Sequence, residues 1–162
     1  MDSDEFRGKW WHKMRQQGVL PEKAIDRALD KLCTLRDVLL KSDFKTFTLD
    51  DVKSITLIPK KDLKGIELDY ESVWEYVKKI KERTMIQIEN LRYEEDKMRR
   101  SQQKYAYILR EQERCVVRIY CMNYFLNFKH ERAMEEVEEV ERPKLPKQDV
   151  YEVGNGFIRV VK

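Results

Sequence analysis

Glycine and proline are scarce in this chain, with five glycines and four prolines among 162 residues. Neither residue occurs between positions 66 and 142. Proline removes a backbone hydrogen-bond donor and glycine adds backbone entropy, so the two residues that most disfavour a helix are missing from this long run. The sequence therefore predicts long helices and few loops.

Cysteine and histidine are also rare. The cysteines are Cys33, Cys115 and Cys121, and the histidines are His12 and His130. Cys115 and Cys121 lie six residues apart, about 240° around a helix, so we expect them to point apart and to stay reduced. Neither histidine has a partner at metal-ligand spacing, and no glycine-rich phosphate loop or nucleophile motif occurs. We expect no catalytic residue, no metal, no cofactor and no small-molecule substrate, and hence no enzyme.

Charge of one sign and long apolar runs are lacking too. Lys and Arg number 33 against 30 Asp and Glu, which leaves a net charge of +3 and no strong overall field. The first residues are acidic where a signal peptide is basic, and Arg118 interrupts the longest apolar run after three residues. These features predict an intracellular, cytoplasmic protein without a membrane span.

The most apolar stretch runs from residue 115 to residue 128. Eleven of its fourteen residues are apolar or aromatic, and the exceptions are Arg118, Asn123 and Asn127. A helix that is apolar nearly all round is buried by other elements on several sides. The fold class predicted is therefore mainly α, a bundle of about four helices around one long central helix, with a small β-hairpin at the C-terminus.

Three further helices precede the central one. The first is predicted to begin at a Ser3 cap and to end at Gly18, and the second to run from Pro21 to about Lys41. Asp69 is predicted to cap the third. Residues 43–68 read as an irregular connector: Thr48 could cap a short helical turn, and the β-branched residues 54–58 predict a short extended segment.

A helix through the polar residues 92–104 would have no apolar face to bury. Either two helices meet there in a turn, or one long helix projects into water. We favour a turn near residues 99–103, so that the fourth helix starts at about Lys104 and continues into the acidic residues 131–141. These helices make up a predicted domain of residues 1–142.

A proline-rich linker at 143–148 and a β-hairpin at 149–162 complete the predicted organisation. Asn155-Gly156 lies between two β-rich runs and is the typical two-residue hairpin turn. Because an isolated hairpin is marginal in water, we expect it to dock on another chain. Its predicted partner-binding residues, with the exposed member of the tryptophan pair, are Tyr151, Val153, Phe157, Ile158, Val160 and Trp11.

A basic cluster with neighbouring tyrosines suggests a possible nucleic-acid contact. Its members are Arg92, Lys97, Arg99, Arg100 and Lys104. Single-stranded nucleic acid is commonly bound by basic grooves with aromatic platforms, although the acidic residues 94–96 interrupt this cluster. A small nucleic-acid-binding protein is therefore an alternative reading.

The order of parts resembles the α-rich GINS subunits of archaeal and eukaryotic replication, which have an N-terminal helical domain and a small C-terminal β domain. The matching stretches are Thr56-Leu57-Ile58-Pro59, Asp69-Tyr70, residues 75–81, the helix 109–126, and the final segment with Tyr151 and Gly156. The β part is shorter than the family's and the first forty residues are longer. The resemblance implies a non-catalytic subunit that bridges the replicative helicase to a nuclease-like partner.

The leading hypothesis is a non-catalytic helical scaffold of an intracellular multiprotein complex, associated with DNA replication and close to DNA. Its expected partners are other protein subunits, in a homo- or hetero-oligomer. Besides the nucleic-acid-binding alternative, a small helical subunit of a viral or CRISPR-type assembly shares the same scaffold role, and the residues do not separate it from the first hypothesis.

Overall fold

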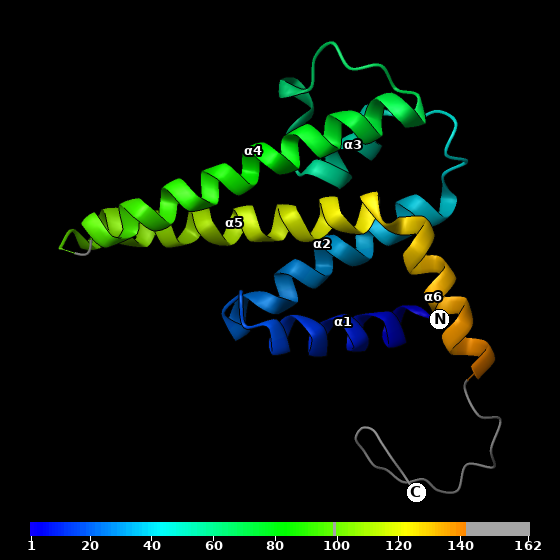
Figure 1. Ribbon diagram of the computed structural model, residues 1–162, viewed down its shortest axis with the longest axis horizontal. Coiled ribbons are helices and arrows are strands. Elements are labelled where there is room, and N and C mark those ends of the chain that lie inside the picture. Colours follow the sequence, from blue (N-terminus) through cyan, green and yellow to red (C-terminus); the bar gives the residue numbers. More distant parts are fainter. Residues whose placement is uncertain (99, 142–162) are drawn as a thin grey trace, which may run out of the picture. The chain divides into compact units, whose positions relative to one another are not determined.

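The computed structural model describes residues 1–98 and 100–141, with the backbone alone at 139–141 (Figure 1). The described chain is helical, with one isolated β-bridge between Thr46 and Asp69. Its elements in order are α1 (Ser3–Gln17), α2 (Glu22–Lys41), α3 (Leu49–Thr56), the 3-10 helix η1 (Lys60–Asp62), α4 (Tyr70–Lys97), α5 (Gln102–Leu126) and α6 (Phe128–Glu141). The mainly α prediction is confirmed, and α3 and α6 add to the four helices expected.

The chain divides into two compact units, one of residues 2–128 and one that holds Met1 and the residues from 129 onward. In the first unit, α5 packs against α4, α2 and α3, so the central position predicted for the stretch from residue 115 is confirmed. Its residues Cys115, Cys121, Met122 and Phe125 are buried, and all three cysteines are free. Burial of this apolar surface is the main favourable term that holds the unit together.

Helices α1 and α2 begin and end close to the predicted positions. The cap of α1 is Asp2 and not Ser3: the Asp2 carboxylate accepts a hydrogen bond of 2.8 Å from the backbone N–H of Glu5. The same hydrogen bond lowers the pKa of Asp2. Gly18 ends α1 with a φ of 66°, a left-handed conformation that glycine adopts without a steric penalty.

The extended segment predicted at 54–58 is wrong, because α3 continues to Thr56. Thr48 and Asp51 form a reciprocal capping box, with hydrogen bonds of 3.1 and 2.9 Å between each side chain and the other residue's backbone N–H. Val52 and Ile55 then lie on one buried face of the helix. Capping and tertiary burial at helical spacing outweigh the β preference of these residues.

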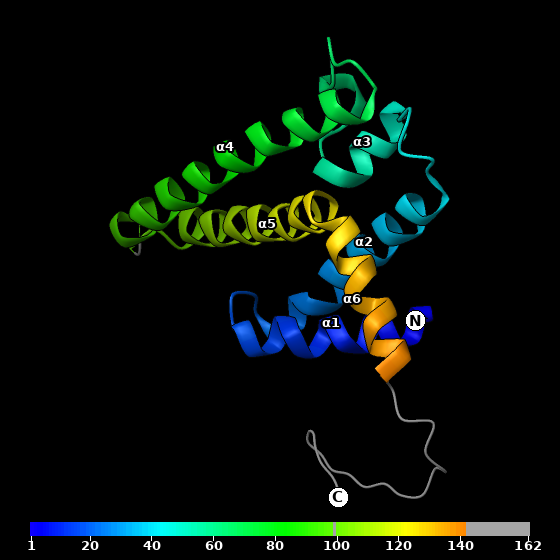
Figure 2. The ribbon, with the colours of Figure 1, turned by 45° about the vertical axis from the view of Figure 1, so that its right-hand side comes forward.

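Helices α4 and α5 form a hairpin, and the predicted turn is confirmed between Lys97 and Gln102. Asp69 caps α4 as expected and accepts a hydrogen bond of 3.0 Å from the backbone N–H of Ser72. Figure 2 shows, as Figure 1 does, that the two helices run side by side and that their turn lies beyond α1 and α2. The hairpin therefore has an inner part, packed on the body of the unit, and an outer arm.

The helix predicted to run from residue 104 to residue 141 is interrupted at Asn127, where α5 ends and α6 begins. The Asn127 amide donates a 2.9 Å hydrogen bond to the backbone oxygen of Asn123. A side-chain amide that binds the local backbone competes with the helical pattern. The linker predicted at 143–148 and the hairpin predicted at 149–162 lie outside the described residues.

Candidate functional site

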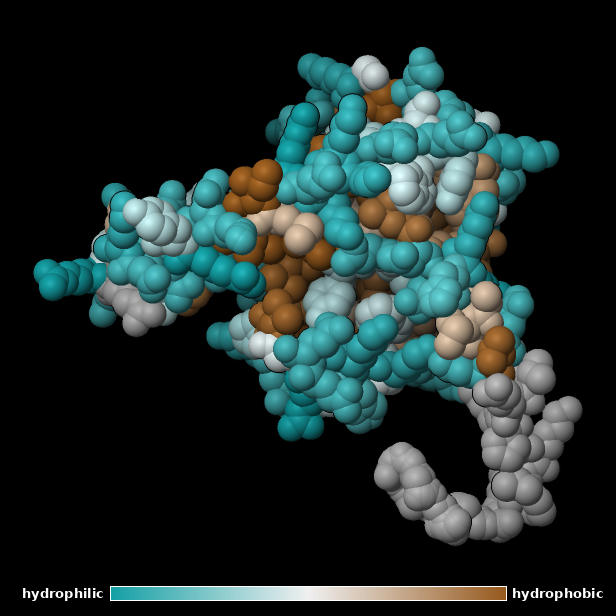
Figure 3. All heavy atoms as spheres, in the orientation of Figure 1, coloured by the Kyte–Doolittle hydropathy of each residue, from teal (hydrophilic) through white to brown (hydrophobic). Residues whose placement is uncertain are grey.

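An apolar groove of about 720 Å³ opens on the first unit where α4, α5 and the end of α1 meet. Figure 3 shows hydrophobic side chains gathered in a hollow at this place, over α4, α5 and the loop between α1 and α2. The groove is lined by Gln17, Val19, Met85, Ile86, Ile88, Glu89, Asn90, Arg92, Val116, Ile119, Tyr120 and Asn123. It is the candidate functional site.

Helix α4 supplies one wall because it carries apolar side chains on more than one face. Ile88 and Leu91 are buried, together with Thr84. Met85 and Ile86 lie off that face, and their side chains are 50% and 63% exposed. Exposed apolar groups that cluster around a groove, unlike scattered single ones, mark an interaction site.

Helix α5 supplies the floor. Val116, Ile119, Tyr120 and Asn123 follow one another at spacings of three, one and three residues, so they share one helix face. The Asn123 Oδ1 atom is buried and accepts no hydrogen bond from a described residue. A buried acceptor without a donor is costly, so the floor has one unsatisfied polar atom beside its apolar side chains.

The opposite wall is the end of α1 and the loop that follows. The left-handed Gly18 turns the chain so that Leu20 is buried and Val19 remains 48% exposed. The hydroxyl of Tyr120 donates a hydrogen bond to Gln17 Oε1, which ties this wall to the floor. Partial burial raises the pKa of the Tyr120 hydroxyl, so it remains a neutral donor at physiological pH.

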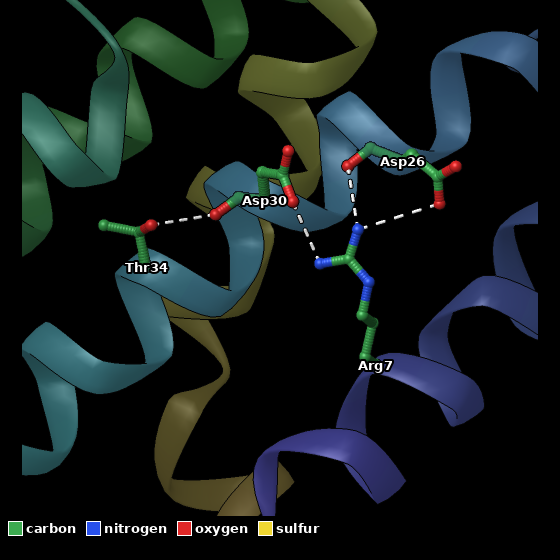
Figure 4. Close-up of polar contacts among 4 residues, drawn as sticks. All are labelled: Arg7, Asp26, Asp30 and Thr34. Carbon is green, nitrogen blue, oxygen red and sulfur yellow. Dashed lines mark hydrogen bonds and ion pairs between the residues drawn. The ribbon is translucent and has the colours of Figure 1, made fainter.

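Helix α1 is held to α2 by an arginine clamp (Figure 4). The Arg7 guanidinium donates a 2.9 Å hydrogen bond to Asp30 Oδ1 and one of 3.4 Å to the backbone oxygen of Asp26. The hydrogen bond from Arg7 to Asp30 raises the pKa of the guanidinium. Because these groups are partly exposed to water, the clamp fixes the alignment of α1 more than it adds stability.

Two charged side chains, Glu89 and Arg92, line the groove, whereas charged residues elsewhere in the unit form ion pairs. Arg15 approaches Glu22 at 3.6 Å, and Arg27 pairs with Glu113 of α5. On α4, no described residue forms an ion pair with Glu89 or with Arg92, which lie one helical turn apart. A ligand in the groove would meet one acidic and one basic group on this wall.

The predicted nucleic-acid residues do not form one surface with the groove, apart from Arg92, which lines it. Lys97 lies 4.4 Å from the centre of the exposed Tyr93 ring, near the turn of the hairpin. Arg100 and Lys104 are exposed at the same turn. Arg99 lies outside the described residues.

Of the predicted partner-binding residues, Trp11 is described. Its neighbour Trp10 is buried against Phe6 and Tyr124, whereas Trp11 is partly exposed and has the Arg15 guanidinium 5.4 Å from its ring. Tyr151, Val153, Phe157, Ile158 and Val160 lie outside the described residues. The groove was not predicted from the sequence, although the adjacent Met85 and Ile86, which lie beside the main apolar stripe of α4, were a usable signal.

Within residues 1–98 and 100–141, no group of three or more His, Cys, Asp or Glu side chains could hold a metal ion. None of the helices in the described part is long and apolar enough to cross a membrane. No protein-family model, curated protein or solved structure matches the chain.

Proposed function

We propose that this protein is a non-catalytic helical scaffold that binds other protein subunits of an intracellular complex through its apolar groove. One observation carries the proposal: three large apolar side chains, Val19, Met85 and Ile86, surround an open groove whose floor is also apolar. Their exposed surface is what a docked chain would cover.

The size and shape of the site fit a secondary-structure element of another chain. The groove runs along a pair of packed helices, and a further element laid against them would find apolar contacts on both walls. Complete burial of a large apolar side chain contributes roughly 1.5–3 kcal/mol, so three that are about half exposed still have several kcal/mol to gain. That gain is large enough to select a partner.

Site-specific photocrosslinking tests this proposal. A benzophenone amino acid at position 86 is expected to crosslink one defined protein in cells of the source organism, because its side chain lies at the edge of the groove. The same probe at Leu109, which is 40% exposed on α5 and does not line the groove, is the matched control. Adding Met85→Glu should lower the yield at position 86 about tenfold, the equivalent of about 1.4 kcal/mol.

The proposal fails if positions 86 and 109 give the same products, or if Met85→Glu leaves the yield at position 86 unchanged. The finer hypothesis, a GINS-like helicase accessory factor, requires in addition that the crosslinked protein belongs to the replication machinery. A product of any other class would leave the scaffold proposal in place and remove the replication assignment.

A second candidate function rests on the turn of the α4–α5 hairpin. The turn brings Lys97, Arg100 and Lys104 together with the exposed Tyr93, a combination of cations and an aromatic ring that suits single-stranded nucleic acid. If this surface binds nucleic acid, a labelled oligonucleotide should bind at low salt, and Arg100→Glu with Lys104→Glu should reduce both its affinity and its salt dependence. Absence of binding at low salt would exclude the candidate.

A further inference from the structure

The apolar groove has the same length along both of the long helices that line it. Its lining residues run from Met85 to Arg92 on α4 and from Val116 to Asn123 on α5. At a rise of about 1.5 Å per residue, each of these stretches is about 10 Å long. An occupant that follows the groove therefore meets apolar side chains over about two turns of helix.

The backbone around the groove offers little to an extended chain. The lining residues of α4 and α5 lie inside helices, whose N–H and C=O groups bond along the helix itself. The one β-bridge of the described chain, between Thr46 and Asp69, does not line the groove. A strand buried against these side chains would leave backbone groups without partners, whereas a helix satisfies its own. The groove therefore favours a helical occupant.

The apolar rim of the groove is exposed on both sides. Met85 and Ile86 are 50% and 63% exposed, Val19 opposite them is 48% exposed, and Figure 3 shows the hollow open on this face. Sites for small molecules commonly enclose most of the ligand surface. An open rim favours a larger occupant that covers the rim together with the floor, as the apolar face of a helix does.

Two charges on α4 add a direction to the site. Glu89 and Arg92 line the groove three positions apart, and no described residue forms an ion pair with either. A complementary helix carries one acidic and one basic residue at a similar spacing. In a helix antiparallel to α4 the acidic residue comes first, opposite Arg92, and the basic residue follows, opposite Glu89. An acidic residue that precedes a basic one by four positions also stabilises the helix that carries them.

We infer that the apolar groove binds an amphipathic helix of a partner protein, which lies antiparallel to α4 and carries an acidic residue followed three or four positions later by a basic one. The inference rests on the proposed function, because it gives the class of partner for the same groove. Apolar residues at positions i, i+3, i+4 and i+7 form a stripe about two turns long, which matches the groove. The stripe covers Val19, Met85 and Ile86, while the two charges pair with Arg92 and Glu89.

Selection from a phage-displayed library tests the inference. The library holds linear peptides of about 16 residues, about 24 Å long as a helix, and is selected on the full chain. Peptides that also bind the Ile86→Glu variant are discarded. The remaining peptides are expected to share the helical apolar spacing and the acidic–basic order, and to gain helical circular dichroism on binding. Leu109→Glu, which places the same charge outside the groove, should bind them as the wild type does.

Proline scanning of a selected peptide separates a helix from an extended chain. Proline at a solvent-facing position in the middle of the peptide should raise the dissociation constant about 100-fold, because it breaks the helix. Alanine at the same position is the control and should change the dissociation constant less than about twofold. Fluorescence anisotropy of the labelled peptide measures both values.

A charge exchange tests the direction of the helix. Glu89→Arg together with Arg92→Glu reverses the two charges of the groove and should weaken the selected peptide at least about tenfold. Exchange of the acidic and basic residues in the peptide should then restore its affinity. Circular dichroism of the variant confirms that its own helices are formed.

Several results would overturn the inference. These are a selection that yields no peptide dependent on Ile86, selected peptides that tolerate the central proline, and a charge exchange that the reversed peptide does not restore. The crosslink at position 86 keeps the two proposals apart. If it maps to a strand or a loop of a partner protein, the scaffold function stands and only the helical partner is wrong, whereas the absence of any defined product contradicts the scaffold function itself.

Discussion

Replacing Phe125 with alanine is expected to lower the free energy of unfolding by about 3–5 kcal/mol. Phe125 is 1% exposed and belongs to an aromatic cluster, with its ring centroid 5.8 Å from that of Phe47 and 6.1 Å from that of Tyr70. The substitution removes the buried ring and leaves a cavity between α5, the residues that precede α3, and the start of α4. Urea unfolding followed by circular dichroism measures the loss.

The exposed aromatic residue Tyr93 is the control for this experiment. Its side chain lies near the turn of the hairpin and is largely exposed, so Tyr93→Ala should change the free energy of unfolding by no more than about 0.5 kcal/mol. A loss below about 1 kcal/mol for Phe125→Ala would show that the aromatic cluster does not form the core of the first unit.

In the folded protein, the rate of alkylation of Cys121 is expected to be about 1,000-fold lower than that of an unburied thiol at the same pH. Burial raises the pKa of its thiol from 9.0 to about 12, and the reactive species is the thiolate, whose population falls tenfold for each unit of pKa. Iodoacetamide labelling at pH 8, followed by peptide mass spectrometry, measures the rate at each cysteine.

Cys33 serves as the internal control, because it is only partly buried and should react first. In urea the two cysteines should react at similar rates. The raised pKa also makes stability depend on pH: the folded state holds the Cys121 proton more tightly than the unfolded state, so stability is constant below pH 9 and falls as the pH rises toward 12. Equal labelling of Cys33 and Cys121 in the native protein would contradict the buried position.

Helix boundaries were the most predictable part of the structure. Gly18 and Asp69 are local signals, and each acts through its own backbone geometry or through a hydrogen bond to a residue three positions away. The turn between α4 and α5 was predictable for a related reason, since polar residues on all sides leave a helix with nothing to bury. Such signals act between residues that are close together in the sequence, so they can be recognised from the sequence alone.

Helix α3 shows where local preference fails. Three of residues 54–58 are β-branched, namely Ile55, Thr56 and Ile58, and by themselves they favour an extended chain. In the fold, Val52, Ile55 and Thr56 are all buried, because this short helix packs against α2, α4 and α5. Contacts with residues far away in sequence supply more free energy than the local preference, and no local pattern reports them.

The sequence by itself determined that this protein is helical, that the stretch from residue 115 is its centre, and that α1, α2 and α4 begin and end near their caps. Only the tertiary structure decided that Val19, Met85, Ile86 and Tyr120 share one groove. Those four residues belong to three separate segments, and their proximity depends on how α1 is clamped to α2 and how α4 folds back on α5. The hydrophobic pattern shows which side chains are stabilised by burial, whereas the packing of the helices determines which of them stay exposed to solvent.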